Sequence, residues 1–151
     1  MTIANEEGYE ISDDRARLDL AAVHGFLAGS YWSPGIPRDT VERAVEESWC
    51  FGLYAADGGQ AGFARLVTDY ATYAYLCDVF VLDAHRGKGL GRWLMQTIFA
   101  HDATRGMRRI TLATKDAHEL YRQVGFTPLA NPARFMEIAR PDIYQMQGMT
   151  S

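Results

Sequence analysis

One segment of the chain holds most of the residues whose types and spacing suggest chemistry. It is a hydrophobic strand followed by a glycine-rich turn and the start of a helix, with the sequence Val79-Phe80-Val81-Leu82-Asp83-Ala84-His85-Arg86-Gly87-Lys88-Gly89-Leu90-Gly91-Arg92. Glycines let backbone N–H groups approach an anion closely, and a helix N-terminus adds unpaired donors and about half a positive charge. Arg86, Lys88 and Arg92 add three cations with no acid between them, in a chain of net charge -4. The segment therefore predicts a pyrophosphate-binding site.

The spacing of the glycines excludes two common phosphate-binding motifs. The dinucleotide fingerprint G-x-G-x-x-G would need its last glycine where the chain has Arg92, and no P-loop pattern G-x-x-x-x-G-K-[ST] occurs. The chain instead has R-x-x-G-x-G from Arg86 to Gly91. Thirty residues after Gly91 comes Tyr121, within the segment A-H-E-L-Y-R-Q-V-G-F at 117–126.

These two segments together resemble the GNAT superfamily of acyl-CoA-dependent N-acetyltransferases, and the resemblance extends over about residues 9–138. It implies a mixed, splayed sheet that holds acetyl-CoA in the V between its two central strands. It also implies that Tyr121 lies beside the thioester sulfur and protonates the leaving thiolate. The residues that the resemblance assigns to acetyl-CoA are Val79, Phe80 and Val81 through their backbone, Arg86, Gly87, Lys88, Gly89, Leu90 and Gly91 in the turn, and Arg92, Thr114 and Tyr121.

The chain departs from the family pattern at two positions. Thr114 stands where many members have asparagine, and Cys77 stands where many have a glutamate on the central strand. A cysteine there could take the acetyl group first and form a covalent intermediate. Nothing basic adjoins Cys77 in sequence to lower the pKa of its thiol, so a small apolar residue in a strand is the favoured interpretation.

The residues expected at the acceptor site are Asp78, Tyr31 and Trp32. In a strand of period two Asp78 should face away from Cys77, but a bulge of the kind this family has in this strand would turn it toward the substrate. There it would bind a cationic amine or relay its proton; an acid bonded to neighbouring backbone is the alternative. Tyr31 and Trp32 lie in the loop where this family builds its acceptor site. They would form an aromatic wall against a cation or a ring of the acceptor, or they would only pack the loop. For Tyr121, too, the alternative to a catalytic role is a packing role.

The elements around these residues predict an α/β domain with a mixed sheet. The whole chain, 1–151, is expected to be one N-acetyltransferase domain with a core at about 9–140 and a tail at 141–151. Asp69 and Glu137, near predicted strand ends, are weaker acidic candidates. The expected strands are 9–12, 49–56, 62–69, 73–82 and 109–114, with a closing pair at 126–129 and 134–138. The expected helices begin at Ser12, Arg38, Gly89 and Asp116.

Composition limits the partners. A net charge of -4 argues against binding nucleic acid or an anionic membrane, and the longest apolar run is too short to span a bilayer. The two cysteines, Cys50 and Cys77, form no CxxC or Cys/His cluster, so we expect no metal site and a reducing, cytoplasmic location. Oligomeric state is left open, a homodimer included.

The sequence thus predicts direct acetyl transfer from acetyl-CoA to an amine of a small molecule or peptide. Two alternatives stay open. Because Cys77 leaves the central strand without the usual acid, the chain could be a non-catalytic acyl-CoA-binding module or sensor. It could also modify protein lysines or N-termini.

Overall fold

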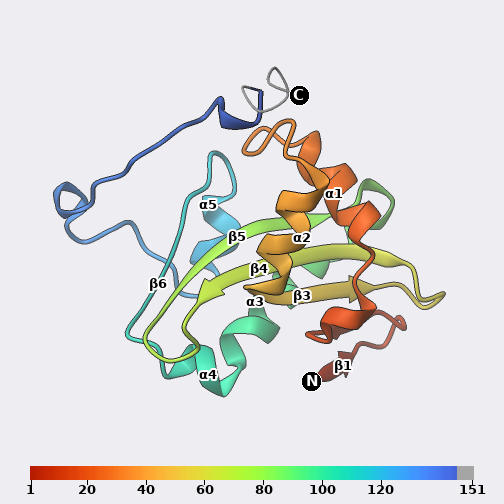
Figure 1. The fold of residues 1–151 in the computed structure, drawn as a ribbon. Helices are drawn as coiled ribbons and strands as arrows, with labels where there is room; N and C mark the ends of the chain where they lie inside the picture. The colour runs from red at the N-terminus through yellow and green to blue at the C-terminus, as the bar shows by residue number, and fades with distance from the viewer. Residues whose placement is uncertain (146–151) are drawn as a thin grey trace.

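The chain folds around a mixed sheet of six strands in the order β1-β2-β3-β4-β5-β6 (Figure 1). The structure, a computed structural model, describes residues 1–145. Neighbouring strands from β1 to β5 are antiparallel, whereas β6 runs parallel to β5. The predicted mixed sheet is therefore confirmed. The strands are β1 (Thr2–Ala4), β2 (Glu10–Ser12), β3 (Trp49–Tyr54), β4 (Gln60–Thr68), β5 (Tyr73–Val81) and β6 (Arg109–Leu112).

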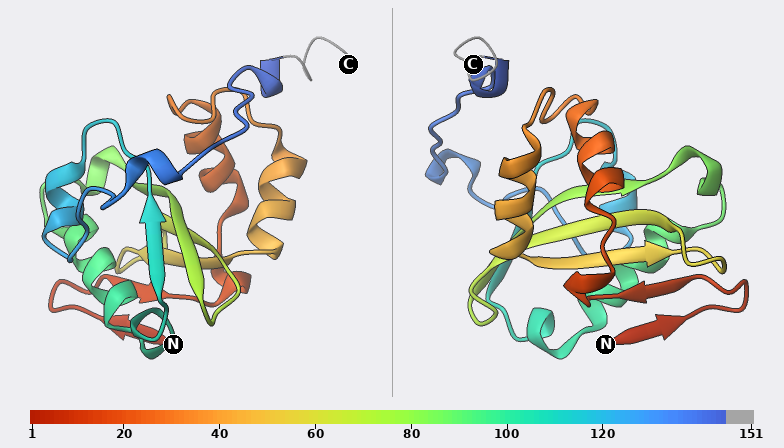
Figure 2. Two further views of the ribbon diagram at one scale, coloured as in Figure 1. Left: turned by 90° about the vertical axis from the view of Figure 1, so that its left-hand side faces the viewer. Right: turned by 45° about the vertical axis from the view of Figure 1, so that its right-hand side comes forward.

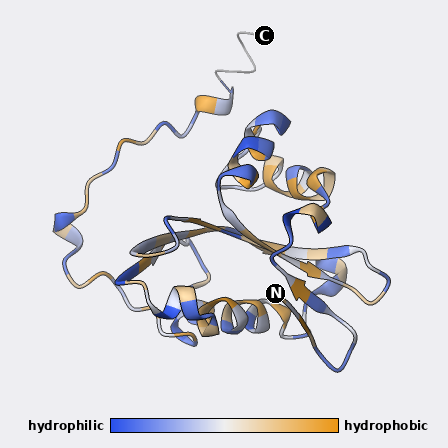
Figure 3. Ribbon diagram, turned by 60° about the horizontal axis from the view of Figure 1, so that its bottom comes forward, coloured by the Kyte–Doolittle hydropathy of each residue, from blue (hydrophilic) through white to orange (hydrophobic). Residues whose placement is uncertain are grey.

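Helices cover both faces of the sheet, as the views in Figures 1 and 2 show. Helices α1 (Leu20–Ala28) and α2 (Arg38–Glu46) lie on one face, over a core that includes Phe63 and Phe80. The other face packs against α3 (Leu90–Ala100), α4 (Asp102–Arg105) and α5 (His118–Arg122). The central strands β3 and β4 are therefore mostly apolar on both faces, and all of β3 is buried. Colouring by hydropathy shows the apolar residues concentrated on these central strands (Figure 3).

Two irregularities of β5 shape the site. The β4–β5 register shifts between Phe63 and Arg65, which places one extra residue on β5, and Asp78 there has a φ of 56°. This is the bulge that the sequence analysis expected. The parallel pairing of β5 with β6 stops at Leu76 and Leu112. Beyond this point the described residues show no further pairing between the two strands, and a cleft lies there.

The N-terminal elements differ from the sequence expectation. The first helix does not begin at Ser12. Instead Arg15–Arg17 form a 3₁₀ turn capped by Asp14, and α1 begins at Leu20 with Asp19 as its N-cap. The unpredicted strand β1 extends the sheet by pairing with β2.

The last predicted helix is also shorter. It begins at His118 rather than Asp116, and its N-cap, Ala117, makes no side-chain capping bond. Thr114 Oγ1 accepts the Ala117 N–H in its place.

The closing strand pair at 126–129 and 134–138 was wrong. These residues form no strand; Pro132–Arg134 is a 3₁₀ turn, and every residue from 127 to 142 is exposed. Pro128 and Pro132 lack the N–H that a ladder needs, and β6 offers an edge of only four residues. The part of the predicted tail at 146–151 lies outside the described residues.

Candidate active site

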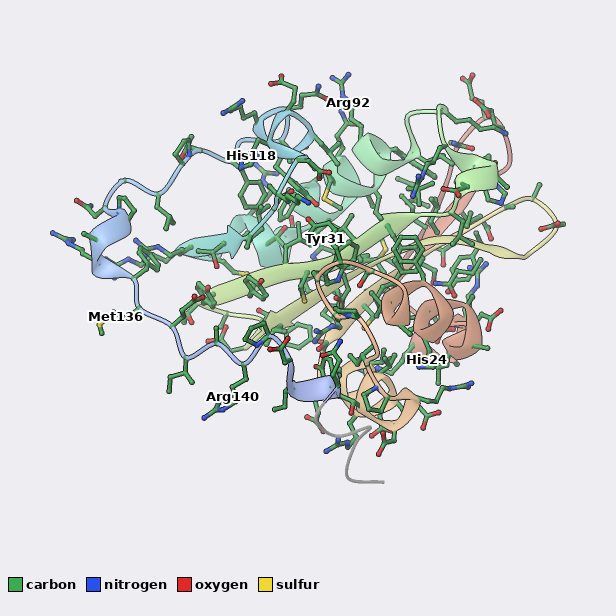
Figure 4. The ribbon with its side chains drawn as sticks, turned by 90° about the horizontal axis from the view of Figure 1, so that it is seen from above. His24, Tyr31, Arg92, His118, Met136 and Arg140 are labelled. Atoms are coloured by element: carbon green, nitrogen blue, oxygen red, sulfur yellow. The ribbon has the colours of Figure 1, made fainter. Side chains whose placement is uncertain are left out.

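The cleft between β5 and β6 collects most of the predicted acceptor and catalytic residues. It has a volume of about 440 Å³. It is bounded by the bulged part of β5, the segment after β6, helix α5 and the α1–α2 loop. Figure 4 shows Tyr31 of that loop near the centre of the molecule, with Arg92 and His118 on the side away from His24. The predicted residues that line this cleft are Tyr31, Trp32, Cys77, Asp78, Val79, Thr114 and Tyr121.

Tyr121 projects into the cleft from α5. Its ring is buried against Phe126, edge to face, with ring centroids 5.9 Å apart. Burial raises the pKa of the Tyr121 hydroxyl to about 12. The phenol is therefore protonated at neutral pH, which is the state a proton donor requires. It also lines a second hollow of about 490 Å³ on the other side, next to His118.

Asp78 is held by side chains rather than by backbone. Its Oδ1 accepts the Trp32 indole N–H at 2.9 Å, and its Oδ2 accepts Arg65 Nε at 2.9 Å. Arg65 in turn donates from Nη1 to Ser48 Oγ at 2.9 Å. The Asp78 side chain is only 10% exposed. A carboxylate has about four acceptor positions, so these two bonds leave it able to accept from a substrate ammonium.

The sequence analysis missed Arg65. It lies on β4 between Phe63 and Val67, with period two, so it shares the face that α1 and α2 cover. A charge at a position of this buried face is the signal that could have found it, because such a charge needs a partner. Among the other cleft residues that were missed, three have polar side chains, namely Tyr75, Lys115 and Asp116.

The α1–α2 loop crosses the cleft to the segment that follows β6. The Tyr31 hydroxyl accepts the Lys115 backbone N–H at 3.3 Å, and Lys115 Nζ lies 5.3 Å from the Tyr31 ring centroid. The Tyr31 and Trp32 rings meet edge to face, with centroids 5.1 Å apart. The two aromatic side chains thus stand at the cleft as the resemblance implied, although both also make packing contacts.

The glycine-rich turn lies beyond the end of β5. Gly87 and Gly89 have φ values of 80° and 71°, in the left-handed region that favours glycine. Gly89 is the N-cap of α3, and no atom lies within 4 Å of the place where a β-carbon of either glycine would stand. Their N–H groups therefore border open space at a helix N-terminus, which fits a phosphate group.

The three cations of this turn are arranged differently. Arg86 turns back on the strand, because Nε donates to the Val81 carbonyl at 3.0 Å and Nη1 pairs with Asp83 at 2.7 Å. Lys88 Nζ donates at 3.2 Å to the hydroxyl of Tyr9, a residue whose side chain is buried. Arg92 is exposed on the first turn of α3. Of the three cations of this turn, Lys88 and Arg92 pair with no acid among residues 1–145.

The side chains of the remaining predicted residues do not reach the cleft. The Phe80 ring stacks on Phe26 at 4.1 Å in the core under α1, and Leu90 is buried, so only their backbone can face a ligand. Asp69 accepts the hydroxyl of Thr72 and backbone N–H groups of its own turn, and these bonds hold the pKa of its carboxyl well below the usual range. Neither Asp69 nor Glu137 is among the residues that line the cleft.

Cys77 is not prepared for nucleophilic attack. Burial raises the pKa of its thiol to about 12, so the nucleophilic thiolate is scarce at neutral pH. We expect Cys77→Ala to keep turnover within about threefold of wild type, since removing a packing thiol disturbs no reacting group. Intact-protein mass spectrometry after mixing with acetyl-CoA should show no acetylated enzyme. A stable adduct that disappears in the variant would contradict this expectation.

Comparison with known proteins agrees with this fold and identifies its family. The model of the GNAT acetyltransferase domain matches residues 47–128. The chain is 32% identical to a Gibberella zeae protein classed as an acetyltransferase, over 75% of each chain. It is 29% identical to serotonin N-acetyltransferase 2 of rice chloroplasts, over 88% of this chain and 68% of that one.

A solved structure of a GNAT-family protein from Xanthomonas campestris superposes with a TM-score of 0.87 and 45% identity, covering 90% of this chain and 96% of that one. The chain therefore belongs to the GNAT acetyltransferase family, and it is an acyltransferase. Among the described residues, no helix has both the length and the apolar character needed to cross a membrane.

Proposed function

We propose that this protein transfers the acetyl group of acetyl-CoA directly to a primary amine of a small molecule or a peptide end. The observation that carries this proposal is that Tyr121 and Asp78 line one cleft, which opens where β5 leaves β6. One residue is a protonated donor and the other is a carboxylate with acceptor capacity to spare. The cleft therefore offers groups for both the leaving thiolate and the incoming amine.

The acetyl-CoA substrate would lie along β5 with its pyrophosphate at the glycine-rich turn. The N–H groups at Gly87 and Gly89 and the start of α3 would bind the phosphates, with Lys88 and Arg92 adding charge. The free edge of β5 at Val79–Val81 would pair with the pantetheine amides. Arg86 would exchange its bond to the Val81 carbonyl for a phosphate contact, and Thr114 would contribute a hydroxyl.

Direct transfer then needs three things from the protein. The amine must be deprotonated and held against the thioester carbon, a placement that supplies much of the rate. Backbone N–H groups of β5 near Val81 would stabilise the oxyanion that forms on the carbonyl oxygen. The C–S bond breaks with the electron pair going to sulfur, and Tyr121 donates its proton to that sulfur.

Asp78 is our candidate for receiving the amine. An amine with a lysine-like pKa of about 10.4 arrives as an ammonium at neutral pH, and the carboxylate would bind it and give its proton a path to solvent. Tyr31, Trp32 and Tyr75 surround the entrance with aromatic rings, which suit a cation or an aromatic body. The name of the rice relative, a serotonin N-acetyltransferase, supports an amine that carries an aromatic ring.

The two alternative functions are less well supported. A sensor without catalysis was suggested by the missing acid at Cys77, but the bulge places Asp78 in the cleft one residue later. Modification of protein lysines requires a cleft open to a folded surface, whereas here the α1–α2 loop bridges the cleft through Tyr31 and Lys115. We also propose a cytoplasmic location, which the two free cysteines support.

Asp78→Asn should raise the KM for the acceptor amine by at least about tenfold, because a charge-assisted bond to the ammonium is replaced by a neutral one. Acetyl-CoA affinity, measured by calorimetry, should stay within about twofold. The matched control is Asp69→Asn, the same change at an acid that does not line the cleft. Equal KM values for wild type and Asp78→Asn would remove Asp78 from the acceptor site.

A further inference from the structure

A buried arginine lies next to the acceptor cleft without lining it. Arg65 on β4 is paired across the sheet with Cys50 on β3 and with Cys77 on β5, so these side chains share one face. Burial raises the pKa of both thiols to about 12, so neither carries a charge at neutral pH. The Arg65 side chain is only 18% exposed, and it is not among the residues that line the cleft. A cation placed this deeply needs an acid beside it, and an apolar side chain would often serve the fold as well.

The acid beside Arg65 is Asp78, and the pair forms at the bulge of β5. The register of β4 with β5 shifts between Phe63 and Arg65, so Arg65 stands directly beside the extra residue on β5. The Asp78 backbone has a φ of 56°, a conformation that a residue other than glycine keeps only where its surroundings hold it. The charge-assisted bond from Arg65 Nε to Asp78 Oδ2, 2.9 Å long, therefore favours the backbone conformation that brings the acid to the cleft.

Arg65 is the more firmly held of the two donors that bind Asp78. The other donor is the indole N–H of Trp32, a residue of the α1–α2 loop that is 40% exposed. Arg65 is fixed at its far end as well, because Nη1 donates at 2.9 Å to the hydroxyl of Ser48, which is only 3% exposed. A guanidinium presents its donors in a planar fork, whereas a lysine ammonium presents them from one point. The position of the Asp78 carboxylate is therefore set mainly from β4.

We propose that Arg65 is a positioning residue for acetyl transfer, which acts on the acceptor amine only through Asp78. This inference rests on the proposed function, in which Asp78 receives the amine. With Oδ2 bonded to Arg65, the carboxylate is held at one place in the cleft and keeps its remaining acceptor positions for the ammonium. The guanidinium also offsets the desolvation of the carboxylate, which favours the charged form that binds an ammonium. Arg65 itself contacts neither the amine nor acetyl-CoA in this arrangement.

The test is a double-mutant cycle on the acceptor KM. The amine is whichever of 2-phenylethylamine, spermidine and free lysine the wild-type protein acetylates fastest. Arg65→Met should raise the acceptor KM by at least about tenfold, as Asp78→Asn does, because the carboxylate loses its anchor. Acetyl-CoA affinity, measured by calorimetry, should stay within about twofold of wild type, because the glycine-rich turn is unchanged.

The double variant separates a positioning role from an independent one. Arg65→Met with Asp78→Asn should have an acceptor KM within about threefold of Asp78→Asn alone, because without the acid Arg65 has nothing to position. Two independent contributions would instead multiply, to about 100-fold over wild type.

A second variant keeps the test decisive if Arg65→Met does not fold. Arg65→Met leaves a buried carboxylate without its cation, whereas Arg65→Lys keeps the charge and loses only the fork. Arg65→Lys should therefore raise the acceptor KM less, by about threefold, and its combination with Asp78→Asn should again match Asp78→Asn alone. Circular dichroism and thermal unfolding check the fold of each variant.

Arg17→Met is the matched control. Arg17 also pairs with an acid, Glu10, at 3.1 Å, and it packs over the Tyr54 ring, but it does not line the cleft. This variant loses an ion pair of the same kind and should keep the wild-type KM for the amine.

The outcomes distinguish this inference from the proposed function. A folded Arg65→Met with the wild-type KM, where Asp78→Asn raises the KM, would overturn the positioning role and leave the proposed function standing. Effects that multiply in the double variant would overturn it in the same way. If Asp78→Asn itself keeps the wild-type KM, the role of Asp78 in the proposed function fails, and this inference fails with it.

Discussion

Gly89→Val should abolish measurable acetyl-CoA binding while the protein still folds. The β-branched side chain would fill the open space in front of the N–H groups at the start of α3, where we place the phosphates. The fold should survive because no protein atom lies within 4 Å of the new β-carbon. The cost is backbone strain at a φ of 71°, of order 1–2 kcal/mol. Isothermal calorimetry with acetyl-CoA measures the binding, and thermal unfolding measures the strain.

The matched control for this variant is Gly58→Val. Gly58, in the β3–β4 hairpin, has a φ of 89° and open space around its own missing β-carbon. It should suffer a similar loss of stability and keep wild-type affinity for acetyl-CoA. If Gly89→Val binds acetyl-CoA as tightly as Gly58→Val does, the turn is only a tight connection between β5 and α3.

Tyr121→Phe should lower turnover by about 10²-fold, within the usual range for the loss of a general acid, and change acetyl-CoA affinity little. The ring and its contact with Phe126 remain, so the fold should be intact. Steady-state assays of CoA release with a good amine acceptor give kcat and KM separately. The loss should fall on kcat, because the proton is needed only when the C–S bond breaks.

Tyr54→Phe is the control for removal of a buried phenol. The Tyr54 hydroxyl is buried without a hydrogen-bond partner among the described residues, and it lies outside the cleft. This variant should keep full turnover.

Because burial raises the pKa of Tyr121 to about 12, wild-type turnover should also show no alkaline decline due to this group between pH 7 and about 10. Unchanged kcat in Tyr121→Phe would leave the tyrosine with a packing role only.

Local chemistry made the glycine-rich turn and its helix predictable from sequence. Three glycines alternate with other residues shortly after an apolar strand, and this pattern is typical of a tight turn that leads from a strand into a helix N-terminus. The place of Tyr121 was predictable only through the resemblance, because nothing in residues 117–126 alone says that their helix faces β5. The bulge at Asp78 was likewise an expectation from the family. Its positive φ falls on an aspartate, and no glycine at this position indicates such a backbone conformation in the sequence.

What the sequence could not predict depends on contacts between distant segments. Arg65 was missed because its partners Asp78 and Ser48 lie 13 and 17 residues away on other elements. The closing strands at 126–129 and 134–138 were expected because their apolar residues fit strands. In the structure Pro128 and Pro132 break the ladder, and the residues from 127 to 142 are exposed instead.

The most direct test of the proposed function follows both products of one reaction. The wild-type protein is incubated with acetyl-CoA and a panel of amines that includes aromatic ethylamines, polyamines, free amino acids and a lysine peptide. Free CoA is measured with a thiol reagent, and each amine is examined by mass spectrometry. We predict that at least one small primary amine gains one acetyl group in an amount equal to the CoA released, and that Tyr121→Phe slows both products equally. Tight binding of acetyl-CoA with no acetylated amine and no CoA release above the protein-free rate would contradict the proposal and favour a sensor.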